Sequence, residues 1–473
     1  MIKNSYICKI KDELLICSSM FLFITCHKFL SITILVIICL AIWTAIKWDT
    51  WFHNPEEASY NAPDQPSWVL LTPGNDGELS RNVSWICGDT LAHSFLQLMG
   101  DSIHDTLTIN AIGEVFESCS GKAAYYHARL DSLISGGHYI YSVVTGGTQS
   151  EWFYFQMPET DAEHFSFVYV GDVQDTIDVQ ANKFIKEAFS RNSDAEMLVC
   201  GGDLTERPTY SYWCETFRDI DSIAQHVPVL NITGNHDYLK GVICTLERRF
   251  PLVFSYFLHS KVDDNMVYTT TFGPVQFFVL DSNREFFYLS KQKSWLENEL
   301  EASTSKWKIL LIHHPLQSAK GNNMIQKWMF DELVNDYGID LVLQAHEHCY
   351  ARMTTKTERG TPTTPVYTIS HCSPKSYRID FDDKFDKFGI SSRYYQTVKV
   401  HGDTLSVAAY EVYANNLYDS LDIIKHDGKS IRIVDYGKDI KEHIEYDVDP
   451  SSSKSVNYKK KVDEYRERHP ERF

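Results

Sequence analysis

Short apolar segments that end abruptly in polar residues recur along the second half of this chain. In the clearest case, apolar and β-branched residues over 229–233 predict a buried strand, and Gly234 allows a sharp turn at its end. Asn235, His236 and Asp237 follow at once. An amide, an imidazole and a carboxylate at the carboxyl end of a strand are suited to metal binding and proton transfer, because open α/β sheets bind ligands at that edge.

Four further segments repeat this pattern of an apolar strand followed by metal-binding residue types. A single ending of this kind could be a polar turn that happens to contain a histidine, but five in order predict a site. The four are 165–170 before Asp172 and Gln174, 197–200 before Asp203, 309–312 before His313 and His314, and 341–344 before His346 and His348.

Helical periodicity alternates with these strands, as in βαβ units. We therefore expect an α/β domain built from two sheets over residues 163–448. The predicted helices cover 177–189, 212–225, 290–301 and 323–337. Further strands are predicted over 267–272, 275–280, 366–370, 397–400 and 405–413.

Residues 60–158 have a different pattern, in which short strands with alternating faces are separated by turn residues. This pattern predicts an all-β sandwich domain. Examples are 82–87, 106–109, 138–144 and 152–155. At the other end of the chain, residues 449–473 are polar and highly charged, and we expect them to form a disordered or frayed tail.

The first 47 residues are predicted to be a leader. Residues 29–46 are almost uninterrupted apolar sequence between Lys28 and Lys47, a length between that of a signal-peptide core and that of a minimal membrane span. The protein is therefore expected to be secreted, periplasmic or at the cell surface, with a membrane tether through residues 29–46 as one alternative. The eleven cysteines have no spacing typical of a disulfide framework or a zinc-thiolate site.

The formal net charge of −18 argues against a nucleic-acid-binding protein, whose surface is normally basic. The overall field of the protein also does not attract an anionic substrate. Local cations must do so, and bound metal is the simplest source of them.

The ordered motifs resemble those of calcineurin-like metallophosphoesterases and, among these, purple acid phosphatases. The matching motifs are Gly171-Asp172, Gly202-Asp203, Gly234-Asn235-His236-Asp237, His313 and His346-Glu347-His348. The resemblance implies a two-sheet catalytic sandwich after a domain similar to fibronectin type III. It also implies two divalent metal ions (Fe, Mn or Zn) held by Asp172, Asp203, Asn235, His313, His346 and His348.

The activity implied by the resemblance is hydrolysis of small phosphate monoesters, as by an acid phosphatase. A metal-activated hydroxide would attack phosphorus, and His236 would protonate or stabilise the departing alkoxide. Asp237 would orient His236. His346 and His348 lie two residues apart and would point in opposite directions on a strand. Both can therefore bind metal only from a loop just beyond it, each facing a different ion.

Three departures from the family pattern leave alternatives open. Glu206 replaces the tyrosine that gives purple enzymes their colour, so we expect no purple chromophore. Gln174 replaces a histidine of many metallophosphoesterases, and is either a weak ligand or a hydrogen-bonding neighbour. Asn322 and Asn323 occupy the region where purple phosphatases carry substrate-binding histidines. The alternatives are a phosphodiesterase or nucleotide hydrolase of the same superfamily, or a non-catalytic binding protein with a degraded site.

Overall fold

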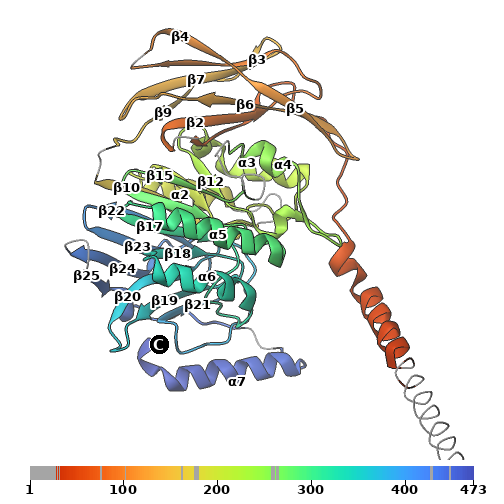
Figure 1. Cartoon of the computed structure of the whole chain (residues 1–473), viewed down its shortest axis with the longest axis vertical. Coiled ribbons are helices and arrows are strands. Elements are labelled where there is room, and N and C mark those ends of the chain that lie inside the picture. Colours follow the sequence, from red (N-terminus) through yellow and green to blue (C-terminus); the bar gives the residue numbers. More distant parts are fainter. Residues whose placement is uncertain are drawn as a thin grey trace, which may run out of the picture. The chain divides into compact units, whose positions relative to one another are not determined.

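The computed structural model of the chain contains two β-rich domains (Figure 1). The residues that it describes are 28, 30, 32–74, 77–101, 103–160, 163–174, 181–256, 262, 266–426, 430–446 and 449–473. Residues 1–27, Phe29 and Ser31 of the predicted leader lie outside the described residues, as does the beginning of the helix predicted over 177–189.

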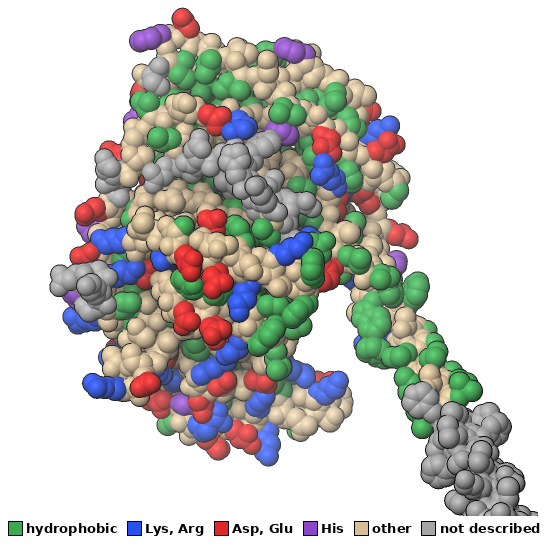
Figure 2. Space-filling model, in the orientation of Figure 1, with side chains coloured by type: hydrophobic (Ala, Val, Ile, Leu, Met, Phe, Trp, Pro, Cys, Tyr) green, Lys and Arg blue, Asp and Glu red, His purple; other side chains and the backbone are tan. Residues whose placement is uncertain are grey.

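The apolar segment near the N-terminus forms a helix over Ile32–Phe52, which is long and apolar enough to cross a membrane. A signal sequence has the same properties, and the helix is consistent with one. Apolar side chains cover its surface (Figure 2). Residues Lys240–Thr245 belong to the same compact unit as the N-terminal segment that ends at Asn54. The Asn54 side chain donates to the Lys240 carbonyl at 3.0 Å and accepts from the Lys240 amide at 2.7 Å.

The N-terminal domain consists of two antiparallel sheets that share one apolar core. Its predicted strands are present, and the core contains Trp85, Tyr126 and Tyr141. One sheet has the order β1 (Ser67–Gly74), β2 (Gly77–Ile86), β6 (Lys122–Leu130), β5 (Ile112–Glu117). The other contains β4 (Ile103–Asn110), β3 (Ser94–Gly100), β7 (His138–Thr145), β8 (Thr148–Gln149) and β9 (Phe153–Gln156).

This β domain is joined to the domain that follows by buried polar and aromatic contacts. Asn82 on β2 donates to the carbonyl oxygens of Pro73 and Ser255, at 3.1 Å in each case. The ring of Trp68 stacks on that of Phe217 with the centroids 5.0 Å apart. The two domains therefore form a packed interface.

We expect Asn82→Ala to lower the free energy of unfolding by about 2 kcal/mol, because it leaves two buried carbonyl groups without their donor. Denaturant titration measures the change. Asn110→Ala, at an exposed position on β4, is the matched control and should change stability by less than about 0.5 kcal/mol. Equal effects of the two substitutions would show that Asn82 does not hold the interface.

The second domain is an α/β sandwich of two mixed sheets, as the sequence predicts. Among the described residues, each sheet has seven strands. The first has the order β12 (Val229–Asn231), β11 (Met197–Cys200), β10 (His164–Val170), β22 (Tyr394–His401), β23 (Thr404–Glu411), β24 (Leu417–His426), β25 (Ser430–Asp435). The second has the order β15 (Tyr268–Phe272), β16 (Val275–Val279), β17 (Trp307–Ile312), β18 (Leu341–Gln344), β20 (Pro362–Ile369), β19 (Tyr350–Lys356), β21 (Lys387–Gly389).

Parallel pairing brings together the strand ends that carry the predicted site. In the first sheet β10, β11 and β12 are parallel neighbours, and in the second β16, β17, β18 and β20 are. Their carboxyl ends therefore lie at a common edge of each sheet. The predicted strands omitted β24 and β25, which extend the first sheet by antiparallel pairing.

The alternation of side chains along β17 shows how the second sheet is buried on both faces. Ile309 and Leu311 belong to the core between the sheets, whereas Leu310 and Ile312 pack in the core with helices α5 (Phe286–Ala302) and α6 (Met324–Asp336). The described part of the domain also contains helices α2 (Ala181–Arg191), α3 (Tyr210–Ala224) and α4 (Arg249–Val253).

The prediction of a disordered tail over 449–473 is wrong. Residues Ser453–Arg468 form helix α7, whose N-terminus is capped by the Ser452 side chain. Tyr458, Val462 and Tyr465 recur at intervals of four and three residues and form a buried stripe on an otherwise charged helix. The composition of this segment is mostly charged and therefore resembles that of a disordered tail. Three buried side chains are nevertheless enough to hold the helix against the protein while its other faces are solvated.

Candidate metal centre

The six predicted metal-binding residues lie in the loops that follow five parallel strands of the two sheets. Asp172 follows β10, Asp203 follows β11 and Asn235 follows β12. In the second sheet, His313 follows β17, and the loop after β18 carries His346 and His348. As expected, these last two histidines lie beyond the end of their strand.

Several of these residues have left-handed backbone conformations, which side-chain-bearing residues adopt rarely. The φ angles are 44° at Asp172, 53° at Asp203, 71° at His346 and 46° at His348. Such strain is concentrated at functional sites, where the surrounding structure enforces it. Gly234 allows another close approach, since a Cβ atom there would lie 2.1 Å from Oδ1 of Asp203.

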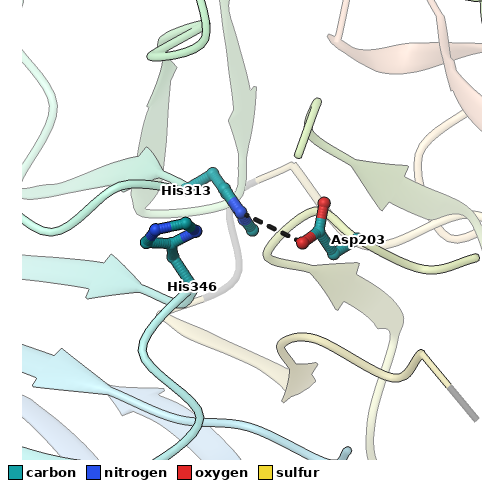
Figure 3. Close-up of side chains that lie close together, drawn as sticks. All are labelled: Asp203, His313 and His346. Carbon is teal, nitrogen blue, oxygen red and sulfur yellow. Dashed lines mark ion pairs between the residues drawn. The ribbon is translucent and has the colours of Figure 1, made fainter. Parts of the chain in front are cut away.

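Asp203 and His313 form the centre of the cluster, with His346 beside them (Figure 3). Oδ2 of Asp203 lies 3.4 Å from Nε2 of His313. One ligand atom from each of the three residues lies within 4.8 Å of the others. The Nδ1–H of His313 donates to the carbonyl of Gly201 at 2.8 Å, which leaves Nε2 available as a metal ligand.

Asn235 joins this group through its side-chain oxygen. Oδ1 lies 3.2 Å from Nε2 of His313 and 2.7 Å from Nδ1 of His346. Asn235, His313 and His346 therefore converge on a single point.

Asp172 and His348 meet on the other side of the cluster. Oδ1 of Asp172 lies 3.7 Å from Nε2 of His348, and Oδ2 accepts from the backbone amide of His346 at 2.6 Å. Both side chains are buried. Among the described residues, Oδ1 of Asp172 has no hydrogen-bond partner, so this oxygen is a buried acceptor that a cation would satisfy.

The neutral form of two of the histidines, His346 and His348, also fits a cation site. Burial lowers the pKa of His348 to about 3 and depresses the pKa of His346 still further, so both imidazoles are neutral, as metal ligands must be. Burial also opposes charge on Asp203 and His313. Their pairing outweighs it, so that the pKa of Asp203 falls below its usual range and that of His313 rises to about 9. Because a metal ligand must be deprotonated, a metal ion at Nε2 of His313 would displace the proton held there and would supply the positive charge beside Asp203 in its place.

The donor set consists of carboxylate and amide oxygens and imidazole nitrogens, without a thiolate. Mn²⁺, Zn²⁺ and Fe²⁺ all accept such ligands. With the orphaned oxygen of Asp172 and the neutral histidines, these donors fit the expected pair of metal ions.

His236 lies beside Asp203 but is held differently from the prediction. Its Nδ1–H donates to the backbone carbonyl of Glu206 at 2.6 Å, and its backbone amide donates to Oδ1 of Asp203 at 2.7 Å. Asp237 accepts instead from the backbone amide of Gly234 at 2.8 Å. The prediction that Asp237 orients His236 is therefore wrong: a backbone carbonyl orients the imidazole, and Asp237 fixes the turn.

The sequence left open whether Gln174 is a weak metal ligand or a hydrogen-bonding neighbour. Its Nε2 donates to Oδ2 of Asp203 at 2.7 Å, so in this structure the residue is a hydrogen-bonding neighbour. The two oxygens of Asp203 are thus each held by one donor, Gln174 and the amide of His236. This arrangement fixes the direction of the carboxylate toward His313.

We expect Gln174→Leu to weaken metal binding or activity by about 10- to 100-fold, because partners that orient a ligand have effects of this size. Metal titration followed by calorimetry measures the affinity. Gln149→Leu, which removes an exposed glutamine that bonds Gln97 in the β domain, is the matched control. If Gln174→Leu binds metal as tightly as this control, the orienting role of Gln174 is refuted.

Sequence reasoning missed the loop after β20, which contributes to the same edge. The ring of Tyr377 stacks on that of His348 with the centroids 4.3 Å apart, and Lys375 pairs with Glu206 at 2.6 Å. The strand over 366–370 was predicted, but Lys375 and Tyr377 lie several residues beyond its end and belong to no motif directly after the strand. His314 lies beside the cluster, with Nδ1 2.9 Å from Oγ of Ser282.

Comparisons with known proteins show which families and structures this chain is similar to. Residues 165–350 match the model of the family described as calcineurin-like phosphoesterase. Purple acid phosphatase 4 of Arabidopsis thaliana is 24% identical over 209 residues, which are 40% of this chain and 60% of the relative. Purple acid phosphatase 23 of the same plant is 21% identical over 393 residues, 70% of this chain and 81% of the relative. The solved structure of purple acid phosphatase PPD1 from yellow lupin has a TM-score of 0.66 at 16% identity, over 77% of this chain and 75% of that one.

Proposed function

The chain is a calcineurin-like metallophosphoesterase related to plant purple acid phosphatases, and on this basis we propose that it hydrolyses phosphate monoesters. The observation that carries the proposal is the convergence of Asp203, His313, Asn235 and His346 on one point, with Asp172 and His348 beside it. A non-catalytic binding protein would not require so complete a set of donors.

We further propose how these donors share the two metal ions. Asn235, His313 and His346 would hold one ion, Asp172 and His348 the other, and Asp203 would serve both. When bound, the two ions would activate a water molecule and neutralise charge on the phosphoryl oxygens.

His236 would act on the leaving group. Because its Nδ1–H is committed to the Glu206 carbonyl, Nε2 is free to hold the proton that the departing alkoxide needs. Gln174 and the His236 amide keep the Asp203 carboxylate directed at His313. Glu206 would not bind metal, since its carboxylate pairs with Lys375.

We also propose that the enzyme is exported. The apolar helix over Ile32–Phe52 supports this location, either as a signal sequence that is removed or as a tether that remains. The mass of the mature protein distinguishes the two alternatives.

The test of the proposed function is a paired assay of the purified protein with added Mn²⁺ or Zn²⁺. We expect hydrolysis of p-nitrophenyl phosphate, slower hydrolysis of bis-p-nitrophenyl phosphate, and loss of both activities after treatment with a chelator. Preference for the diester would indicate a phosphodiesterase. Stoichiometric metal binding with neither activity would indicate a binding protein.

A further inference from the structure

Two lysines lie at the edge of the metal centre, in a chain with a formal net charge of −18. The field of such a protein repels a phosphate ester at long range, so local positive charge is needed to bind it. Neither lysine belongs to the motifs that identify the site.

Lys375 is placed by Glu206. Nζ of Lys375 lies 2.6 Å from both carboxylate oxygens of Glu206, whose backbone carbonyl holds His236. Glu206 therefore connects the lysine to the residue assigned to the leaving group. The Lys375 side chain remains 41% exposed, so its ammonium group is accessible to a ligand.

Lys320 approaches the centre through Tyr377. Its Nζ lies 4.5 Å from the centroid of the Tyr377 ring, a cation–π contact, and the same ring stacks on His348.

Glu347 stands between His346 and His348 in the sequence, and its side chain is buried. This side chain fixes the loop that carries Lys320 to the metal-binding loop. The Glu347 carboxylate accepts from the backbone amides of Ala319 at 2.7 Å and Lys320 at 3.2 Å, and from the hydroxyl of Ser318. The position of Lys320 relative to the metal ligands is therefore set by buried hydrogen bonds.

We propose that Lys320 and Lys375 form a cationic clamp that positions the phosphate of a monoester dianion over the metal centre. This inference rests on the proposed function and names the substrate class of the same site. A lysine ammonium binds phosphate as a point charge, so the clamp favours the doubly charged monoester over the singly charged diester. The clamp takes the place of the substrate-binding histidines that the family resemblance leads one to expect near Asn322 and Asn323.

The test compares Lys375→Met and Lys320→Met with the wild-type protein on p-nitrophenyl phosphate and bis-p-nitrophenyl phosphate. For the monoester we expect kcat/KM to fall about tenfold in each variant, because each loses a charge-assisted contact. The diester value should fall less than about threefold. Lys375→Arg, which keeps the charge, should retain most of the monoester activity.

Two further measurements separate this proposal from the proposed function. Metal content should be unchanged in both lysine variants, and the affinity for inorganic phosphate, measured by calorimetry on the metal-loaded protein, should fall about tenfold. The calorimetric result stands even if the wild type hydrolyses neither ester.

The matched control is Lys399→Met. Lys399 pairs with Asp194 at 2.7 Å and lies opposite Ser166 near the start of β10, at the other end of that strand from Asp172. This variant should behave as wild type. Unchanged phosphate affinity in both clamp variants, or equal losses on the two esters, would overturn the clamp.

Discussion

Asp203→Asn should lower kcat/KM for p-nitrophenyl phosphate by at least about a thousandfold, which corresponds to about 4 kcal/mol of transition-state stabilisation. The substitution preserves the size of the side chain but removes the charge that faces His313 at 3.4 Å. A carboxylate that would serve both metal ions has no substitute in the cluster, because Asp172 faces His348 at the other side.

The matched control is Asp194→Asn, which alters an exposed carboxylate that pairs with Lys399. Its activity and its free energy of unfolding should equal those of the wild type. Denaturant titration of Asp203→Asn shows whether the variant is folded, so that a loss of activity is not mistaken for a loss of folding. A folded Asp203→Asn protein with activity within about tenfold of wild type would refute the central role of this residue.

His236→Gln should have the second-largest effect, and its size should depend on the leaving group. General acids contribute about 10²- to 10⁴-fold, and most when the departing oxygen is strongly basic. We therefore expect a large loss on an alkyl phosphate and a smaller loss on p-nitrophenyl phosphate, whose leaving group requires less protonation. Steady-state kinetics on a series of esters measures this dependence.

His401→Gln serves as the control for this substitution. His401 is exposed at the end of β22, where it pairs with His164 at the start of β10, far along the strand from the metal centre. It should leave all rates unchanged. Equal losses across the series for His236→Gln would assign the residue to phosphate binding instead of proton transfer.

The sequence was informative about the site because metal-binding residue types follow the carboxyl ends of five parallel strands. Parallel strands end at a common edge, so strand order brings Asp172 beside Asp203 in the first sheet and His313 beside His346 in the second. The packing of the two sheets against each other then brings the two pairs into one cluster. The loop position of His346 and His348 followed from strand geometry in the same way.

Other features depend on contacts that no local pattern records. Glu206 was recognised as a departure, but its pairing with Lys375 joins residues on different sheets. Asp237 next to His236 suggested a carboxylate that orients an imidazole, yet the sharp turn directs this carboxylate to the Gly234 amide. In helix α7, the charged composition led to the prediction of a disordered tail, although Tyr458 and Tyr465 are buried.

The number of metal ions bound per chain tests the central claim most directly. After dialysis against Mn²⁺ or Zn²⁺, elemental analysis should find two ions in the wild type and one in each of two variants, Asp172→Asn and His346→Asn, which remove a donor from opposite sides of Asp203. A folded wild-type protein without stoichiometric metal, or variants that retain both ions, would contradict the account.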